Sequence, residues 1–441
     1  MNVSLPSRKS SRLAGVKAAE FFIESEGAGG KVITSGADGV KFFEDGNEDI
    51  LPTKESYFKQ RVNDGSILSL QDAIEVCDKK WIKDDSASCA KKTIQSLVDI
   101  CHKKNNAKKS STSKKMLGAQ NLFSAFKSLK SDDETNVAKV VPDRIYSVTF
   151  HPTSDKILAV AGDKQGYVGL WDTSKSGSDH HTNGVSLFRP HGRPVASLEW
   201  NRGGDRLLSA SYDGSVRLFD IHKQEFSEIF ATYDDSDEFK NKLGYDLDEG
   251  RNFWIQHACI DHVNGDDDCL FISTSAGTVL HVDLRMKKKI TFNKYLSEKK
   301  INTVSLHPNG QTMVTAGLDR MVQIWDIRKF QTDKRQNSNG KVSKPLSIQH
   351  VTKSVNSAFF SPSGRNLLCT TMANTIDIIK DAHLQTSVIK EPTFRIRHDN
   401  QTGRWLSTFM AKWHPAFEEE DIFVVGSMIQ PRTMEFFDGN K

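Results

Sequence analysis

One unit of sequence recurs along the chain from about residue 143 onward, and this repetition constrains the fold more than any other feature. Each copy has an apolar segment ending in a turn such as His-Pro, a second apolar segment, a Gly/Asp turn, and a third segment ending in an aromatic residue and Asp. The clearest copy comprises Ile145–Pro152, Ile157–Gly162 and Tyr167–Asp172. Apolar segments of this length, separated by Gly and Asp turns, predict short β-strands.

Five further copies follow the first. In chain order they span Pro194–Asp220, Phe271–Arg285, Ile301–Arg328, Val355–Thr371 and Trp405–Phe437. The spacing exceeds the roughly 40 to 45 residues of a minimal four-stranded unit, which indicates inserted loops at Asp234–Gly250 and Thr332–Lys344. The pattern predicts an all-β fold, a WD-repeat β-propeller with six recognisable blades.

Propellers of this class usually have seven blades, whereas this sequence stops just after the third segment of the sixth copy, at Phe436–Lys441. Two explanations are open. The sequence is a shortened form, or N-terminal segments such as Lys31–Phe43 and Val137–Val141 complete the ring. We favour the shortened form, because Lys31–Phe43 lies far from the repeats in the sequence.

The predicted division of the chain is an N-terminal arm over residues 1–136 and the propeller over residues 137–441. Within the arm, Ile67–Lys83 and Ala90–Lys104 have helix-like apolar spacing and predict short helices. Eight lysines and no Asp or Glu occur between His102 and Lys130: Lys103, Lys104, Lys108, Lys109, Lys114, Lys115, Lys127 and Lys130. Such a segment buries too little apolar surface to fold alone, so we expect a flexible basic linker.

Composition excludes several classes of protein. The sequence is 37% hydrophobic and 26% charged with a net charge of +4, and no apolar run approaches the roughly 18 residues of a membrane span. Met1–Gly15 is polar and basic, unlike a secretory signal, so we expect an intracellular protein without membrane contact. The six cysteines form no CxxC pair and predict reduced, buried thiols rather than a zinc site or disulfides.

The sequence also lacks the phosphate-binding and catalytic motifs GxxxxGK[ST], GxGxxG, GxSxG and HExxH. We therefore expect no enzyme, cofactor, metal or small-molecule substrate. The Asp, His and Trp residues at equivalent positions of the repeats are expected to hydrogen-bond within their blades. These residues are His191, Asp213, Asp319, Trp171 and Trp325.

Within each repeat, the loop before the first strand and the turn between the second and third strands lie on one rim of the ring, the top rim. The predicted DNA-binding cations of this rim are Lys164, Arg193, Lys299, Lys300, Arg320, Lys353, Arg404 and Arg432. Trp254, Trp405 and Tyr212 are expected nearby, which suits phosphate contacts supplemented by base stacking. Exposed loops are commonly rich in Lys and Arg in any case, so an ordinary solvated rim is the alternative.

Arg285 and Arg328 each lie two residues after the Asp that ends a third strand, which places them on the opposite, bottom rim. In WD-repeat substrate receptors of cullin-type ubiquitin ligases, this Trp-Asp-x-Arg pattern is the docking signature for the adaptor subunit. Many WD repeats carry the pattern without docking, so the motif alone does not decide the function.

The repeats resemble the WD repeat-containing protein 76 family, with its fungal relatives, the DNA damage-binding WD-repeat proteins. The resemblance covers about residues 140–438 and the arm motif Ser10–Leu13. The stretches that carry it are Ala161–Asp172, Ser211–Arg217, Leu318–Arg320 with Ile324–Lys329, and His398–Leu406 followed by Phe423–Met428 and Pro431–Arg432. Two departures are the absent final blade and a divergent arm.

The resemblance implies a nuclear protein that binds DNA, prefers damaged DNA, and acts in the DNA damage response and genome maintenance as a chromatin-associated interaction platform. For some members it also implies service as the substrate receptor of a cullin-four ligase, with protein substrates on the top face. The expected partners are therefore DNA and chromatin, with the ligase adaptor and histones as further candidates.

Overall fold

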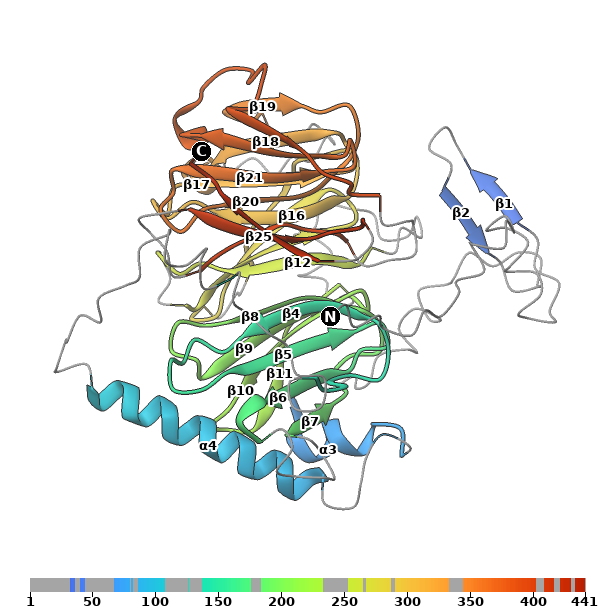
Figure 1. Ribbon diagram of the computed structural model, residues 1–441, viewed down its shortest axis with the longest axis vertical. Helices are drawn as coiled ribbons and strands as arrows, with labels where there is room; N and C mark the ends of the chain where they lie inside the picture. Colours follow the sequence, from blue (N-terminus) through green and yellow to red (C-terminus); the bar gives the residue numbers. More distant parts are fainter. Residues whose placement is uncertain are drawn as a thin grey trace, which may run out of the picture. The chain divides into compact units, whose positions relative to one another are not determined.

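The computed structural model of the 441-residue chain describes residues 32–35, 40–43, 67–79, 81, 86–107, 126, 137–175, 184–232, 253–264, 267–286, 290–332, 344–401, 408–415, 421–429 and 433–440. The chain divides into two compact units, Met1–Lys59 and Gln60–Lys441. In the first unit, β1 (Val32–Ser35) pairs antiparallel with β2 (Val40–Phe43). The second unit contains the other described elements (Figure 1).

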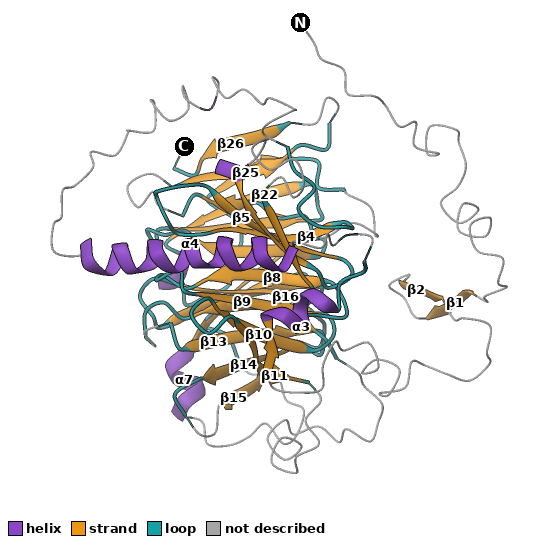
Figure 2. Ribbon diagram, turned by 90° about the horizontal axis from the view of Figure 1, so that it is seen from below, coloured by secondary structure: helices purple, strands orange, loops and turns teal. Residues whose placement is uncertain are grey.

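Six antiparallel sheets in the second unit form the blades of a β-propeller (Figures 1 and 2), as the repeats predict. Blade 1 contains β4 (Ile145–Phe150), β5 (Leu158–Asp163), β6 (Val168–Asp172) and β7 (Val185–Phe188). Blade 2 contains β8 (Val195–Trp200), β9 (Arg206–Ser211), β10 (Ser215–Asp220) and β11 (Glu225–Ala231). Blade 3 contains β12 (Ile255–Ile260), β13 (Cys269–Thr274), β14 (Thr278–Asp283) and β15 (Ile290–Tyr295).

Blade 4 contains β16 (Ile301–Leu306), β17 (Thr312–Gly317), β18 (Met321–Asp326) and β19 (Ser347–His350). Blade 5 contains β20 (Val355–Phe360), β21 (Asn366–Thr371), β22 (Thr375–Lys380) and β23 (Phe394–Arg397). Blade 6 contains β24 (Lys412–Trp413), β25 (Ile422–Gly426) and β26 (Met434–Asp438). Short helical segments follow the third strands of three blades: η2 (Thr173–Lys175), α7 (Ile327–Thr332) and η4 (Ala382–Leu384).

Neighbouring blades are held together by apolar packing and by hydroxyl hydrogen bonds. The three inner strands of blade 3 are buried along their whole length, and polar residues such as Gln256, His257 and Ser273 are buried there among the apolar ones. The Ser147 Oγ donates to the Val195 carbonyl oxygen of blade 2 at 2.7 Å, and the Ala258 N–H of blade 3 donates to the Ser197 Oγ at 3.0 Å. These bonds satisfy polar groups that the packed blades remove from water.

The segment before the repeats packs against blades 1 and 2. β3 (Ile67–Ser69) pairs with β11 as a fifth strand of blade 2, and Ser69 caps the following α3 (Leu70–Glu75). Together with α4 (Ser86–Ala107), α3 shares one apolar core with these two blades (Figure 2). The propeller unit therefore begins well before residue 137, because these amphipathic elements bury their apolar faces on it.

The two expected helices differ in detail from those in the structure. The first begins at Leu70 rather than Ile67, because Ile67–Ser69 pairs with the edge of blade 2. The second extends to Ala107 and so contains Lys103 and Lys104, which were expected in the flexible linker. The rest of that linker lies outside the described residues, apart from Phe126, whose ring stacks on that of Phe436 at 4.1 Å.

Blade 1 has an exposed apolar face where a further blade would pack. Val148 and Phe150 on β4 are 53% and 62% exposed, whereas the equivalent residues of β8, Leu198 and Trp200, are 9% and 6% exposed. The N-terminal segments considered for closing the ring supply no blade strand among the described residues. β1 and β2 pair with each other, and residues 137–141 form no strand although Val141 is buried against blade 1.

The five cysteines whose side chains the structure describes are all buried free thiols: Cys77, Cys101, Cys259, Cys269 and Cys369. Burial raises the pKa of the Cys77 thiol to about 12. Within the described part of the chain, no group of three or more His, Cys, Asp or Glu residues could hold a metal ion. No described helix is long and apolar enough to cross a membrane.

Candidate nucleic-acid interface

The top rim is built by backbone hydrogen bonds that join two loops in blades 1 to 5, including one from the Ser275 N–H to the Trp254 carbonyl at 3.0 Å in blade 3. The N–H at the turn between the second and third strands donates to a carbonyl in the loop before the first strand, so both loops lie at the same end of the blade. The other bonds run from Lys164 to Arg144 (2.9 Å), Tyr212 to Pro194 (3.0 Å), Leu318 to Lys300 (3.0 Å) and Met372 to Ser354 (2.9 Å). The loop arrangement agrees with the one expected from the repeats.

The structure describes six of the eight predicted DNA-binding cations, and all six occur in these loops. Lys164, Lys299, Arg320 and Lys353 are exposed, whereas Arg193 and Lys300 are half-buried. Burial lowers the pKa of Lys300. Arg404, Arg432 and the aromatic Trp405 lie outside the described residues.

Two aspartates of the top rim, Asp163 and Asp213, are bound by neighbouring groups of the rim. Asp163 accepts from the N–H groups of Gln165 and Tyr167 at 2.8 and 2.9 Å. Asp213 accepts from Ser215 Oγ at 2.6 Å and lies 3.2 Å from His191 Nδ1. Burial by itself would raise the pKa of Asp213, but His191 and these hydrogen bonds hold that pKa well below its usual range. The buried carboxylates are therefore internal turn ligands, as the repeat positions predict.

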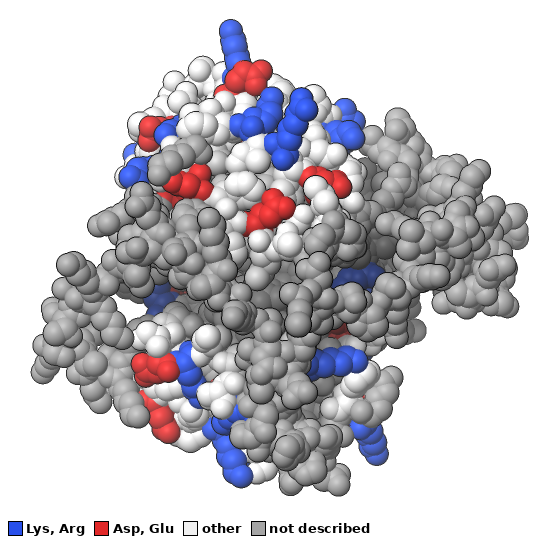
Figure 3. Space-filling model, viewed as in Figure 1, with Lys and Arg blue, Asp and Glu red and all other residues white. Residues whose placement is uncertain are grey.

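Exposed acids interrupt the predicted cationic ring. Glu298 lies beside Lys299, and Asp143 is exposed next to the blade 1 loop. Figure 3, which has the orientation of Figure 1 and does not look onto the top rim, shows the same mixture of Lys and Arg with Asp and Glu on another face. The top rim consequently offers separate positive points spaced around the loops, an arrangement suited to individual phosphate contacts.

Three aromatic side chains form a row across the top of blades 1 to 3. The rings of Tyr146 and Tyr212 are 6.1 Å apart, and those of Tyr212 and Trp254 are 6.0 Å apart. Gln256 fixes the last two, since its Oε1 accepts from Trp254 Nε1 and its Nε2 donates to the Tyr212 Oη, both at 2.9 Å. Burial raises the pKa of Tyr212 to about 12. Tyr146 and Gln256 were missed in the sequence because nothing local distinguishes them from ordinary strand residues.

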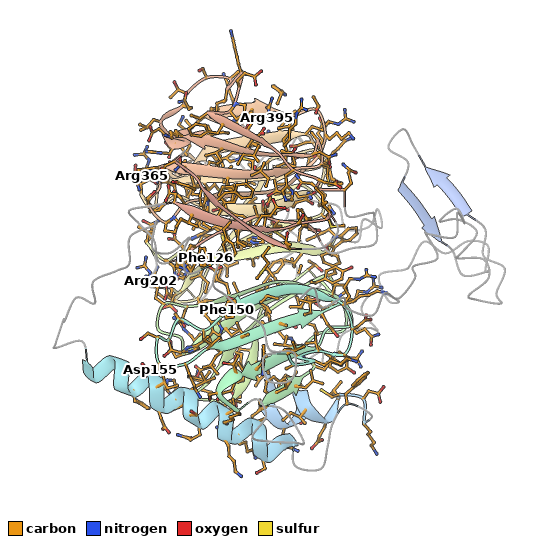
Figure 4. All side chains as sticks on the ribbon, in the orientation of Figure 1. Phe126, Phe150, Asp155, Arg202, Arg365 and Arg395 are labelled. Atoms are coloured by element: carbon orange, nitrogen blue, oxygen red, sulfur yellow. The ribbon has the colours of Figure 1, made fainter. Side chains whose placement is uncertain are left out.

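The bottom rim is the opposite end of the blades, where the first strand leads to the second and the third strand ends. Figure 4 labels Asp155, Arg202 and Arg365 there, each in the first of these loops. Arg285 and Arg328 are exposed on this rim, and each forms a two-point ion pair with the Asp two residues earlier, at 2.8 to 2.9 Å. The Arg285 guanidinium lowers the pKa of Asp283 to about 2.

Both arginines line one cleft of about 840 Å³ between blades 3 and 4. The cleft wall includes His281 and Phe292, whose rings stack with centroids 5.2 Å apart. The sequence pattern places each arginine on the bottom rim but does not reveal that the two share a cleft, because that depends on how adjacent blades are rotated.

The family described as WD domain, G-beta repeat, matches residues 182–220 and 287–326. WD repeat-containing protein 76 of Xenopus laevis is 34% identical over 309 residues, which are 69% of this chain and 47% of that protein. The chain is a WD40-repeat protein homologous to WD repeat-containing protein 76. The protein of that name from Mus musculus is 31% identical over 361 residues, covering 80% of this chain and 51% of the relative.

A fungal relative, DNA damage-binding protein cmr1 of Neurospora crassa, is 30% identical over 299 residues, covering 63% of this chain and 53% of that protein. The chain thus spans about half the length of the curated relatives it matches. The contact expected for Trp171 is absent, because its buried Nε1 has no hydrogen-bond partner among the described residues, whereas blade 4 has its expected polar contacts. Trp325 Nε1 donates to Thr315 Oγ1 at 2.9 Å, and Ser297 Oγ donates to Asp319 at 2.8 Å.

Proposed function

We propose that this WD40-repeat protein binds DNA on its top rim, with a preference for damaged DNA. In this proposal it acts in the nucleus, in the DNA damage response and genome maintenance, as a non-enzymatic, chromatin-associated interaction platform. The observation that carries the proposal is the combination of exposed top-rim cations, Lys164, Arg320 and Lys353 among them, with the aromatic row Tyr146–Tyr212–Trp254. The name of the fungal relative, DNA damage-binding protein cmr1, supports the proposal.

The two parts of the surface perform different tasks. Lysine and arginine side chains on separate loops contact phosphates without reading sequence. Aromatic faces stack with bases that have left the double helix, and an unpaired or damaged base leaves at a lower energetic cost than a paired one. A rim that combines phosphate contacts with aromatic faces for base stacking therefore favours DNA with a local distortion over an intact duplex.

Fluorescence anisotropy with plain and ultraviolet-irradiated duplexes at several salt concentrations tests the proposal. The variant K164E/R320E/K353E should lose most of its affinity, because charge reversal replaces phosphate attraction by repulsion. The matched control R202E/K223E/R365E reverses three exposed bottom-rim cations and should bind like the unchanged protein. Equal binding by both triple variants, or no salt dependence, would contradict a top-rim DNA site.

The shared cleft of Arg285 and Arg328 favours a second candidate function, docking of a cullin-four ligase adaptor on the bottom rim. The protein would then serve as a substrate receptor, with histones or other protein substrates on the top face. R285A/R328A should abolish recovery of the adaptor and cullin in a native pull-down, while K223A should leave it unchanged. Recovery unaffected by R285A/R328A would exclude docking through this cleft. The two functions use opposite rims and are compatible.

A further inference from the structure

A second cavity, of about 390 Å³, lies at the top rim between blades 5 and 6. Blade 5 supplies the turn between β21 and β22 and the residues that follow β23. Blade 6 supplies residues after β25 and one side chain of β26. The lining residues are Ala373, Asn374, Thr375, Arg397, His398, Asp399, Ser427, Met428, Ile429 and Glu435.

His398 is a buried residue of this cavity, and its side chain is fixed by several contacts. Its side chain is 5% exposed, and its ring stacks on Phe409 with centroids 5.8 Å apart. Its Nδ1 lies 2.7 Å from the Oδ1 of Asn400, a fully buried residue. Asn400 is anchored in turn, because its Nδ2 donates to the carbonyl oxygens of Thr371 and Thr375 at 2.8 and 2.9 Å. These hydrogen bonds hold His398 and Asn400 in place at the base of the cavity, which we call the floor.

These contacts determine which atom of His398 is available to a ligand. Both Nδ2 hydrogens of Asn400 are used by carbonyl oxygens, so its Oδ1 must face His398 and can only accept. Nδ1 of His398 therefore carries a proton, which leaves Nε2 as the only ring nitrogen that can accept a hydrogen bond. This Nε2 lies 3.8 Å from the Oε2 of Glu435, whose side chain is 35% exposed. These two atoms are too far apart for a direct hydrogen bond.

Glu435 and the Nε2 of His398 offer acceptors to a group that enters the cavity, and Arg397 also lines the cavity as an exposed cation. Asp399 adds a second exposed carboxylate at the rim, and Ile429, 66% exposed, adds an apolar wall beside Met428. A group with several N–H donors and a positive charge satisfies Nε2 of His398 and Glu435 together, while a hydrocarbon stem lies along Met428 and Ile429.

We propose that this cavity binds the side chain of a single arginine or lysine from a basic polypeptide. Glu435 forms the ion pair, His398 accepts a second hydrogen bond from the same cationic head, and the apolar wall contacts the methylene stem. A nucleobase fits less well, because Glu435 and Asp399 together outweigh the charge of Arg397 and repel the phosphates to which the base is attached, and the floor offers an acceptor. The site does not depend on the DNA-binding proposal.

Calorimetric titration of the full chain with the peptide acetyl-Gly-Arg-Gly-amide tests the inference. The lysine peptide is the second cationic probe, and a peptide with citrulline in place of arginine keeps the shape while removing the charge. The cationic peptides should bind at least about tenfold more tightly than the citrulline peptide, and Glu435→Gln should weaken them by a similar factor. Glu391→Gln, which removes an exposed carboxylate paired with Arg395 outside the cavity, should have no effect.

Three outcomes would overturn the proposal. The first is equal affinity for arginine and citrulline peptides. The second is undiminished binding by Glu435→Gln, provided that its thermal unfolding matches that of the unchanged protein. The third is binding of adenosine or cytidine that depends on Glu435 and excludes the cationic peptides, which would assign the cavity to a nucleobase.

Discussion

His262 Nε2 lies 3.2 Å from Glu199 Oε1, and this contact joins blade 3 to blade 2. The other ring nitrogen, Nδ1, lies 2.6 Å from Asp267 Oδ1. A second carboxylate oxygen of Glu199 accepts from the Ile260 N–H at 3.0 Å, so the glutamate is itself held in place. The imidazole therefore links two carboxylates across the boundary between two blades, an arrangement that favours its protonated form.

This arrangement predicts a pH-dependent contribution of His262 to stability. Burial opposes the positive charge, but the hydrogen bonds and charges of Glu199 and Asp267 raise the pKa of His262 above its ordinary value of 6.5. A histidine whose pKa is higher in the folded state than in the unfolded state stabilises the fold. The full stabilisation is present when the pH lies below the pKa of the unfolded state, and it is lost as the pH rises through the pKa of the folded state. The free energy of unfolding contributed by His262 should therefore decrease from about pH 6 upward.

Urea denaturation of the protein and of His262→Gln between pH 5.5 and 8.5 measures this contribution as a difference. The comparison is necessary because His257 has the opposite behaviour: burial lowers its pKa to about 3, so it destabilises the fold as pH falls. The two proteins should differ most at pH 5.5 and converge at high pH. A difference in the free energy of unfolding that does not change with pH would show that Glu199 and Asp267 do not raise the pKa of His262.

Substitution of equivalent residues in blades 1 and 2 should have very different costs. Trp200, at the end of β8, is 6% exposed and its ring lies 4.8 Å from that of His151 in blade 1. Phe150, at the end of β4, is 62% exposed. Trp200→Ala should lower the free energy of unfolding by about 3 to 5 kcal/mol, and Phe150→Ala by about 0.5 kcal/mol or less. A large cost for Phe150→Ala in urea denaturation would mean that β4 is covered in solution.

Asp213 should be among the least replaceable polar residues of the propeller. It is 2% exposed and is bound by His191, Ser215 and the Gly192 N–H. Removing its carboxylate leaves several buried donors without an acceptor, which costs about 1 to 3 kcal/mol for each donor. Asp213→Ala should therefore lower the thermal midpoint strongly, whereas Asp155→Ala, at an exposed turn, should not. Similar thermal midpoints for the two variants would contradict the role of the buried network.

The sequence predicts the structural features that recur in every repeat. It does not predict features that depend on a single contact between distant residues. The strands around Trp171 and Trp325 and the buried aspartates follow from the repeat, since each copy encodes the same local geometry. β3 could not be predicted, because three residues carry too little pattern and their pairing with β11 is non-local. The His398 cavity was equally hidden. Its stretch was recognisable as unusual, but its geometry depends on Glu435 from another blade.

The salt dependence of DNA binding provides a residue-level prediction for the top rim. Each phosphate contact that is lost should reduce the slope of log affinity against log salt by about 0.9. Lys353 and Arg320 are exposed on neighbouring blades, so Lys353→Gln and Arg320→Gln should each reduce the slope by about one, and the double variant by about two. Lys223→Gln on the bottom rim is the control. If the single variants lower affinity without changing the slope, these side chains act through the loop structure rather than by contacting phosphates.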